Sequence, residues 1–447
     1  MFRTQWSRRR VWFGGSVAFA VFALAPMVVT RAQPTDEAPS LSGVVTMRRA
    51  LELFRQSGFD LLVAEASVRS AEGDLFIARA VANPGVSGGA GKNFACADSQ
   101  DCTAISYSVG LTDNDALSSF LSGKYGLRRD IATAALAAAR RSRDDAQRAL
   151  EFQVKQAYLA VLQAQALVQN AVETRDAYAR TRELNERRFA AGAINEGDLA
   201  TIQVAALESE QVATQAAQTL RVAKVSLAFL LGRRSLVPDY AVDAKDLEFT
   251  VPPALRAPTR EWLLEGALAR RPDLRARVED ERRADAGLAL AKRNRIPDVG
   301  LSATYTANGS GNTNISPPNL TIGLSFTLPV FYLQRGEIAK AEADLFTQRV
   351  LREKAEAAIV SDVETAWAQL SAAQQLVARM ERGLLDRAQK ARDIVQVQYE
   401  KGAASLLDLL NAQRTYSATR AEYAQALASY WTAVALLEQA TATEFRS

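Results

Sequence analysis

The sequence predicts a mainly helical protein with a membrane β-sheet, built from one duplicated unit. Three observations indicate this fold class. Motifs recur at an offset of about 210 residues, long stretches lack both glycine and proline, and four short segments alternate apolar with small polar residues. Each unit is therefore expected to contain long coiled-coil helices and one β-hairpin.

Residues 1–32 are expected to form a secretory signal peptide. Arginines at positions 3, 8, 9 and 10 precede a mostly apolar run, and Thr30-Arg31-Ala32 offers small residues for cleavage after Ala32. The alternative is an uncleaved membrane anchor, because the run is close to the minimum length that spans a bilayer. Removing the signal peptide takes away five arginines and no acid, so the formal net charge falls from +4 to −1. The basic pI of the precursor therefore does not indicate a nucleic-acid partner, and none is expected.

The chain lacks histidine, the residue type that much side-chain catalysis needs. This absence removes Ser-His, Cys-His and His-metal chemistry, and no pair of acids suggests a carboxylate enzyme. We therefore expect no enzymatic activity, no metal site and no cofactor. Cys96 and Cys102 are candidates for a disulfide in an exported chain, with a pair of free thiols as the alternative.

Internal repeats divide the mature chain into two halves. Tyr158 matches Trp367 at an offset of 209, and the segment at 189–203, FAAGAINEGDLATIQ, matches YEKGAASLLDLLNAQ at 399–413. Further pairs are Asp60-Leu61 with Asp273-Leu274, Asn83-Pro84 with Ile296-Pro297, and Ile131 with Ile338. The offset drifts only where Gly, Asn and Ser collect, as loop insertions in a duplicated unit would produce. The expected divisions are a first repeat at 33–237, a linker at 238–258 and a second repeat at 259–447.

Each repeat is expected to contain helices much longer than those of ordinary globular domains. The runs without glycine or proline are 127–190, 198–231, 337–382 and 403–447, and Gly383 interrupts one of the arms. In the first run, apolar and alanine residues alternate spacings of four and three. This heptad seam consists of Leu150, Val154, Ala157, Val161, Ala164, Val168 and Ala171. The seam fits an intramolecular bundle as well as a larger helical assembly.

Four strands are expected, at about 84–94, 104–112, 298–307 and 319–329. The last shows the pattern most clearly, because Leu320, Ile322 and Leu324 alternate with threonine, glycine and serine. Strands of this length span a bilayer when tilted. Four strands cannot close a barrel, so three copies would pool twelve of them, since open edges are not tolerated in lipid. An isolated soluble hairpin is the alternative.

In this order, the motifs resemble the TolC family of outer-membrane efflux channels, over nearly all of the mature chain. The shared features are the turn Gly-x5-Asp-Leu-x3-Gln in both halves, Arg271-Pro272-Asp273-Leu274, and Leu328-Pro329-Val330-Phe331 followed by Gly336. The segment 122–129, SGKYGLRR, is similar to the heavy-metal-efflux branch.

The resemblance implies a homotrimer whose twelve-stranded barrel lies in the lipid of the outer membrane and continues into an α-helical periplasmic tunnel. It further implies a passive exit duct that works with a periplasmic adaptor and an inner-membrane pump of the RND type. Two alternatives are a periplasmic coiled-coil adaptor and, within the family, a type I protein secretion duct.

The repeated turn has a structural and a functional interpretation. Ser405 with Asp408, and Asn195 with Asp198, have capping-box spacing, and Gly192 and Gly402 would end the preceding helices. The resemblance adds a periplasmic gate. It implies that Asp408 belongs to an acidic ring and that Asp198 bonds to Tyr399, holding the entrance shut. A second ring position is Asn411 here, and a gate arginine is replaced by Ala404, so a weaker lock and a less cation-selective mouth are expected.

Overall fold

The computed structural model describes residues 41, 43–92, 105–256, 258–308, 318–326 and 328–445. These residues belong to one compact unit, Ala38–Ser447. The expected signal peptide, 1–32, and the disulfide candidates Cys96 and Cys102 lie outside the described residues. Within the described part of the chain, no helix combines the length and the apolar character needed to cross a membrane.

The first half contains two of the long helices that the sequence predicts. Its helices are α1 (Met47–Ser57), α2 (Phe59–Arg79), α3 (Ala116–Leu121), α4 (Lys124–Ala190) and α5 (Glu196–Leu230). The 67 residues of α4 include Gly126, so the helix begins before the expected run. One glycine costs only about 1 kcal/mol of helix stability, which the packing of so long an arm can offset.

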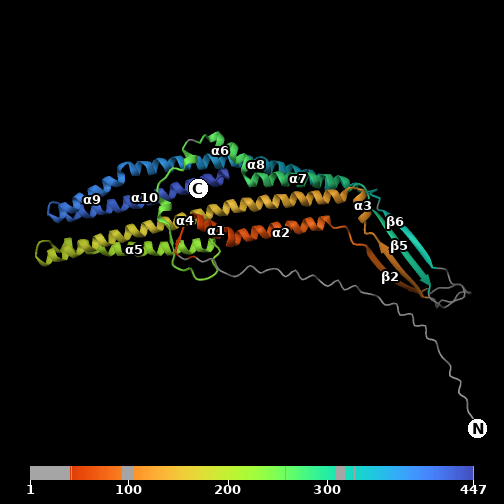
Figure 1. The fold of residues 1–447 in the computed structure, drawn as a ribbon, viewed down its shortest axis with the longest axis horizontal. Coiled ribbons are helices and arrows are strands. Elements are labelled where there is room, and N and C mark those ends of the chain that lie inside the picture. Colours follow the sequence, from red (N-terminus) through yellow and green to blue (C-terminus); the bar gives the residue numbers. More distant parts are fainter. Residues whose placement is uncertain are drawn as a thin grey trace, which may run out of the picture. The chain divides into compact units, whose positions relative to one another are not determined.

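The second half repeats this order, except that it has no counterpart of α3 and its long arm is divided. Its helices are α6 (Arg260–Arg270), α7 (Pro272–Arg293), α8 (Arg335–Arg379), α9 (Leu385–Glu400) and α10 (Leu406–Thr441). Between α8 and α9 lies a π-helical segment, Met380–Leu384, in which Gly383 has φ +148°. The expected interruption at Gly383 is confirmed, because its non-helical backbone makes a kink at which the arm divides into α8 and α9. Figure 1 shows the hairpins α4–α5 and α9–α10 running to one end of this unit, and the strands lying at the other.

The four strands form one antiparallel sheet in the order β2-β3-β5-β6. Their bounds are β2 (Gly85–Lys92), β3 (Ile105–Thr112), β5 (Val299–Asn308) and β6 (Asn319–Phe326). The strand expected to reach 329 ends at Phe326, which pairs with Val299, the first residue of β5. Apolar side chains on one face are largely exposed, such as Val86 at 74% and Leu324 at 70%.

The linker holds the helices together at mid-length. The short strands β1 (Val44–Val45) and β4 (Ala241–Val242) pair in parallel, and two 3-10 turns follow at Ala244–Leu247 and Pro253–Leu255. These segments surround the main core, in which Tyr158 of α4 and Tyr430 of α10 are fully buried.

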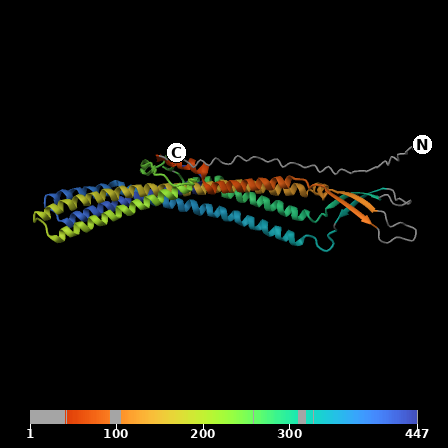
Figure 2. The ribbon, with the colours of Figure 1, turned by 90° about the horizontal axis from the view of Figure 1, so that it is seen from below.

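The heptad seam of α4 packs inside the chain. Val154 and Val161 are completely buried, and Ala164 and Ala171 are nearly so. Helix α4 contacts α2 and α7 toward the strands, and α5 and α10 toward the hairpin tips. Figure 2 shows these helices lying alongside one another in a second view. The intramolecular packing that the sequence left open is therefore present.

Candidate functional site

The two long hairpins end in turns of the same geometry. Gly192 follows α4 with φ +72°, and Gly402 follows α9 with φ +78°. At each turn the next residue's amide reaches back five residues, from Ala193 to the carbonyl of Arg188 and from Ala403 to that of Gln398, both at 2.8 Å. This is the Schellman arrangement, which requires the left-handed conformation that glycine adopts at no steric cost.

Asp408 belongs to a reciprocal capping box at the start of α10. Its amide donates to the Ser405 hydroxyl at 3.1 Å, and the Ser405 amide donates to its carboxylate at 3.1 Å. The Ser405 hydroxyl also donates to that carboxylate, at 2.6 Å, and these hydrogen bonds lower the pKa of Asp408. The carboxylate is therefore both a helix cap and a permanent negative charge at neutral pH.

The first tip has the corresponding cap in a slightly different form. The Asp198 amide donates to Asn195 Oδ1 at 2.8 Å, and Asn195 Nδ2 donates to the Asp198 carboxylate at 3.0 Å. The return bond thus comes from the asparagine side chain instead of the backbone amide. Asp198 faces its own cap residue.

A small apolar cluster joins the two tips. It contains Tyr178 of α4, Ile202 and Ala206 of α5, Tyr399 of α9, and Leu406, Leu409 and Leu410 of α10. Ile202 is 0% exposed and Tyr399 only 5%. Burial of these side chains stabilises the contact between the hairpins by about 25 cal/mol per Å² of apolar surface. Ala404 packs against the same cluster.

Tyr399 makes its polar contact with a residue that the sequence analysis did not single out. Its hydroxyl donates to Asn185 Oδ1 of α4 at 2.6 Å, and Asn185 is 0% exposed. Asn185 Nδ2 in turn donates to the Thr181 carbonyl at 2.8 Å, which fixes the amide orientation. The expected bond between Asp198 and Tyr399 is therefore replaced. Asn185 lies on α4 about one helical turn before Arg188, which is close to the tip.

Arg188 adds a second link from α4 to the end of α9. Its guanidinium lies 4.8 Å from the centre of the Tyr399 ring and donates to the carbonyls of Tyr399 (3.4 Å) and Glu400 (3.1 Å). These carbonyls belong to the last turn of α9, where the helix leaves acceptors unpaired and carries partial negative charge. The Arg188 guanidinium therefore pairs with these free acceptors and offsets the partial negative charge at the end of α9.

Asp408 and Asn411 lie together on an exposed face of α10, one helical turn apart. The apolar cluster does not include them, and both side chains are exposed, with the Asp408 carboxylate held in its capping box by Ser405. Within this chain the structure brings Tyr399, Asn185 and Arg188 together, and it leaves Asp408 and Asn411 apart from them.

One signal in the sequence could have revealed Asn185 and Arg188. At the repeat offset of 210 the second half has Val395 and Gln398 in their places. An asparagine and an arginine that occur in one copy only, where the other copy has valine and glutamine, suggest a contact that the other copy does not need. Their partner, however, lies more than 200 residues away, and spacing within one helix does not identify it.

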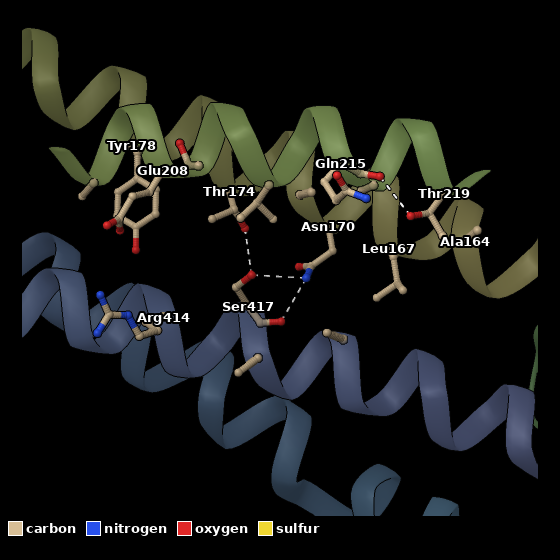
Figure 3. A pocket seen from close by; sticks show the side chains of 17 residues that line it. Ala164, Leu167, Asn170, Thr174, Tyr178, Glu208, Gln215, Thr219, Arg414 and Ser417 are labelled. Carbon is tan, nitrogen blue, oxygen red and sulfur yellow. Dashed lines mark hydrogen bonds between the residues drawn. The ribbon is translucent and has the colours of Figure 1, made fainter. Parts of the chain in front are cut away.

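Above the tips, α4, α5 and α10 enclose a groove of about 540 Å³ (Figure 3). Asn170 of α4 bridges to α10 by donating to the carbonyl (2.9 Å) and hydroxyl (3.2 Å) of Ser417, and Thr174 donates to the same hydroxyl at 3.0 Å. Tyr178 and Arg414 lie at the end of the groove near the tips, and burial raises the pKa of Tyr178. The hydrogen bonds from Asn170 and Thr174 to Ser417 hold α10 against α4.

Comparison with known proteins places this architecture in a family. The model of the outer membrane efflux protein family matches residues 50–233 and 263–443. The chain is 26% identical over 407 residues to the cobalt-zinc-cadmium resistance protein CzcC of Cupriavidus metallidurans, covering 89% of this chain and 90% of that protein. It is 29% identical over 390 residues to the pyoverdine export outer membrane protein OpmQ of Pseudomonas aeruginosa, covering 81% and 77%.

Solved structures share the fold. The outer membrane protein VceC of Vibrio cholerae matches with a TM-score of 0.71 at 19% identity, over 90% of this chain and 97% of VceC. A structure of CusC matches with a TM-score of 0.73 at 18% identity, over 93% and 98%.

The chain belongs to the outer membrane efflux protein family. It is an outer-membrane channel component of an efflux system, with long helices that extend into the periplasm. Members of this family are channels rather than enzymes, and they act with an adaptor and an inner-membrane pump. The family assignment favours the channel over the periplasmic coiled-coil adaptor that the sequence left as an alternative.

Proposed function

We propose that three copies of this chain form a passive exit duct through the outer membrane. The observation that carries this proposal is the open sheet. Within the described residues, β2 and β6 each pair with one neighbour only, and the sheet's apolar side chains are exposed. Edge strands in lipid need partners for their amides and carbonyls. Pairing β6 of one copy with β2 of the next would close a sheet of twelve strands.

Reconstitution tests the duct. The purified protein should migrate as a trimer in detergent and give discrete conductance steps in planar lipid bilayers. Cell fractionation should recover the protein in the outer-membrane fraction, as expected for a chain whose strands lie in the lipid. A monomer in the soluble periplasmic fraction, without conductance, would overturn the proposal.

The partners are proposed from the same architecture. The hairpin tips are the parts of the unit farthest from the strands (Figure 1), so a duct with its sheet in the outer membrane presents them toward the inner membrane. There they would meet a periplasmic adaptor and an inner-membrane pump of the RND type. In-cell cross-linking from cysteines placed at exposed tip positions such as Ala193 and Ala403 should capture the adaptor.

The gate is proposed to lie at the tips, with Asp408 of each copy in an acidic ring. Three carboxylates near one axis would attract cations and disfavour anions. Asp408→Asn keeps a capping oxygen while removing the charge, so it should lower cation preference in bilayers without loss of the trimer. Asn411→Asp should raise cation preference. Unchanged ion selectivity in both variants would contradict the ring.

The proposed cargo is a divalent metal ion. The likeness to CzcC covers most of both chains, and segment 122–129 has the character of the heavy-metal branch. A strain lacking this gene should become more sensitive to cobalt, zinc or cadmium and recover on complementation. Sensitivity to organic toxins alone would instead favour a drug or siderophore duct, and loss of an exported protein would favour a type I secretion duct.

A further inference from the structure

The first half returns from the sheet to its long helix through residues 113–125, a segment that contains α3 and is called the α3 corner below. Figure 1 shows α3 between the helices and the strands. The second half returns from β6 to α8 without such a helix, and the hydrogen bonds of its described residues 328–334 stay within that half. The α3 corner, in contrast, also bonds to the second half and therefore joins the two halves at the base of the sheet.

The α3 corner holds both segments that lead from helices into strands. These segments contain the matched pairs Asn83-Pro84, before β2, and Ile296-Pro297, before β5. A residue that precedes proline is kept out of the helical conformation, so its carbonyl needs a donor from elsewhere. Asn114 Nδ2 donates to the Asn83 carbonyl at 2.9 Å, and Lys124 Nζ donates to the Ile296 carbonyl at 2.7 Å. The same corner thus supplies the donor at both matched positions.

Lys124 is buried although its side chain carries a charge, and it is only 2% exposed. Its Nζ also donates to Asp298 Oδ1 at 2.9 Å. Ser118 Oγ donates to the same carboxylate oxygen at 3.3 Å and accepts from the Val299 amide at 2.8 Å. A buried ammonium is costly unless it is paired, so these bonds fix residues 296–299 against the start of α4. All of the contacts lie within one chain, and association with further copies can only bury Lys124 more.

The residues held in this way determine where β5 begins. Val299 is its first residue, and β5 lies inside the sheet, between β3 and β6. Asp113 continues the contact along the strand, because its carboxylate accepts from the Leu301 amide at 2.9 Å and its own amide donates to the Leu301 carbonyl at 3.1 Å. The α3 corner therefore fixes the direction in which the sheet leaves the helices.

We propose that the α3 corner is a clamp that sets the angle between the sheet and the helices, with Lys124 as its positioning residue. This inference rests on the proposed duct and adds to it the residues that keep the bore of the sheet aligned with the helical tunnel. Strand tilt and stagger are linked in a closed barrel, so three copies must present their sheets at one angle. With the clamp loosened, the three sheets would meet at more than one angle, and the duct would lose its single bore.

Single-channel conductance of the purified full-length trimer in planar bilayers tests the clamp. Lys124→Met keeps an unbranched side chain but removes the ammonium, which leaves the Asp298 carboxylate and the Ile296 carbonyl without their donor. The unmodified trimer should give one main conductance level, whereas Lys124→Met should give several levels and a lower melting temperature. Asp298→Asn keeps an acceptor for Lys124 and Ser118 and should broaden the conductance less.

Lys155→Met is the matched control. Lys155 of α4 forms a short ion pair with Glu438 of α10 at 2.6 Å, and both side chains are largely buried within the helical part of the chain. Losing this pair should lower the melting temperature as well, but it should leave one conductance level because the sheet is not involved. The control therefore separates a change in the direction of the sheet from a general loss of stability.

The outcomes separate the clamp from the duct. A single, unchanged conductance level in Lys124→Met would overturn the clamp even if the melting temperature falls. Several levels in Lys155→Met would also overturn it, because the spread would then follow stability. If Lys124→Met yields no trimer that inserts, Asp298→Asn decides, and an unchanged level in that variant contradicts the clamp. An unmodified trimer that inserts but never conducts would overturn the duct, and the clamp with it.

Discussion

The two halves of the chain descend from one pattern but use their long arms differently. Helix α4 runs without a break from the strands to the first tip, while the matching arm of the second half consists of α8, a kink at Gly383 and α9. The first arm packs against neighbours on several sides, and α9 contacts mainly α10. Duplication has thus produced one continuous arm, which we expect to be rigid, and one jointed arm.

The largest expected effect concerns the matched aromatic pair Tyr158 and Trp367. Tyr158 is fully buried in α4 and donates to the Val45 carbonyl at 3.0 Å, whereas Trp367 of α8 is only partly buried. Tyr158→Ala should cost about 3–5 kcal/mol, and Trp367→Ala roughly half of that. Thermal melting followed by circular dichroism in detergent measures both. Equal losses would show that the two arms are held equally well at mid-length.

The acids Asp60 and Asp273 occupy matched positions with different surroundings. Burial raises the pKa of Asp273, but hydrogen bonds and charge from Arg271 outweigh it and hold the pKa below its usual value. A carboxyl whose pKa is lower in the folded state stabilises the fold above the unfolded pKa of about 4, and this stability is lost as pH falls through the folded value.

Asp273→Asn should therefore cost about 1–2 kcal/mol at neutral pH and reduce the stability lost on acidification. The cost stays moderate because Arg271 retains Asp362 at 2.8 Å. Asp60→Asn is the control, since Asp60 is exposed. Melting temperatures measured from pH 7 to pH 3 distinguish them, and parallel curves for the two variants would contradict the assignment.

The smallest effect should be the same in both halves. Gly192→Ala and Gly402→Ala each place a Cβ at positive φ, and neither added carbon meets an atom within 4 Å. Each should therefore lose about 1 kcal/mol from backbone strain alone. A much larger loss at one tip, read from the melting temperature, would show that its turn has a contact the other turn lacks.

Local sequence rules predicted most of this fold. Helix lengths followed from the absence of breakers, and the capping of α10 followed from Ser405 and Asp408, because these are interactions within a few residues. The kink between α8 and α9 lies at Gly383, where the sequence predicted an interruption. Strand β6 ends at Phe326, opposite Val299, which is the first residue of β5.

The candidate site was less predictable because it joins distant parts of the chain. The family resemblance pointed to Tyr399 and implied Asp198 as its partner, whereas in the structure Tyr399 bonds to Asn185 and Arg188. The Asp198 side chain instead accepts a hydrogen bond from Asn195, the residue that caps α5. Several polar groups of α4 could contact Tyr399. The one that does depends on the relative rotation of the two hairpins, which cannot be predicted from residue spacing within one hairpin.

Amide hydrogen exchange of the purified trimer, read by mass spectrometry, most directly tests the contrast between a rigid and a jointed arm. The account predicts that peptides from 385–400 in α9 exchange much faster than peptides from 170–190 in α4, and that Arg188→Ala accelerates exchange in α9 while leaving α4 unchanged. Equal protection of the two segments, unaffected by Arg188→Ala, would contradict it.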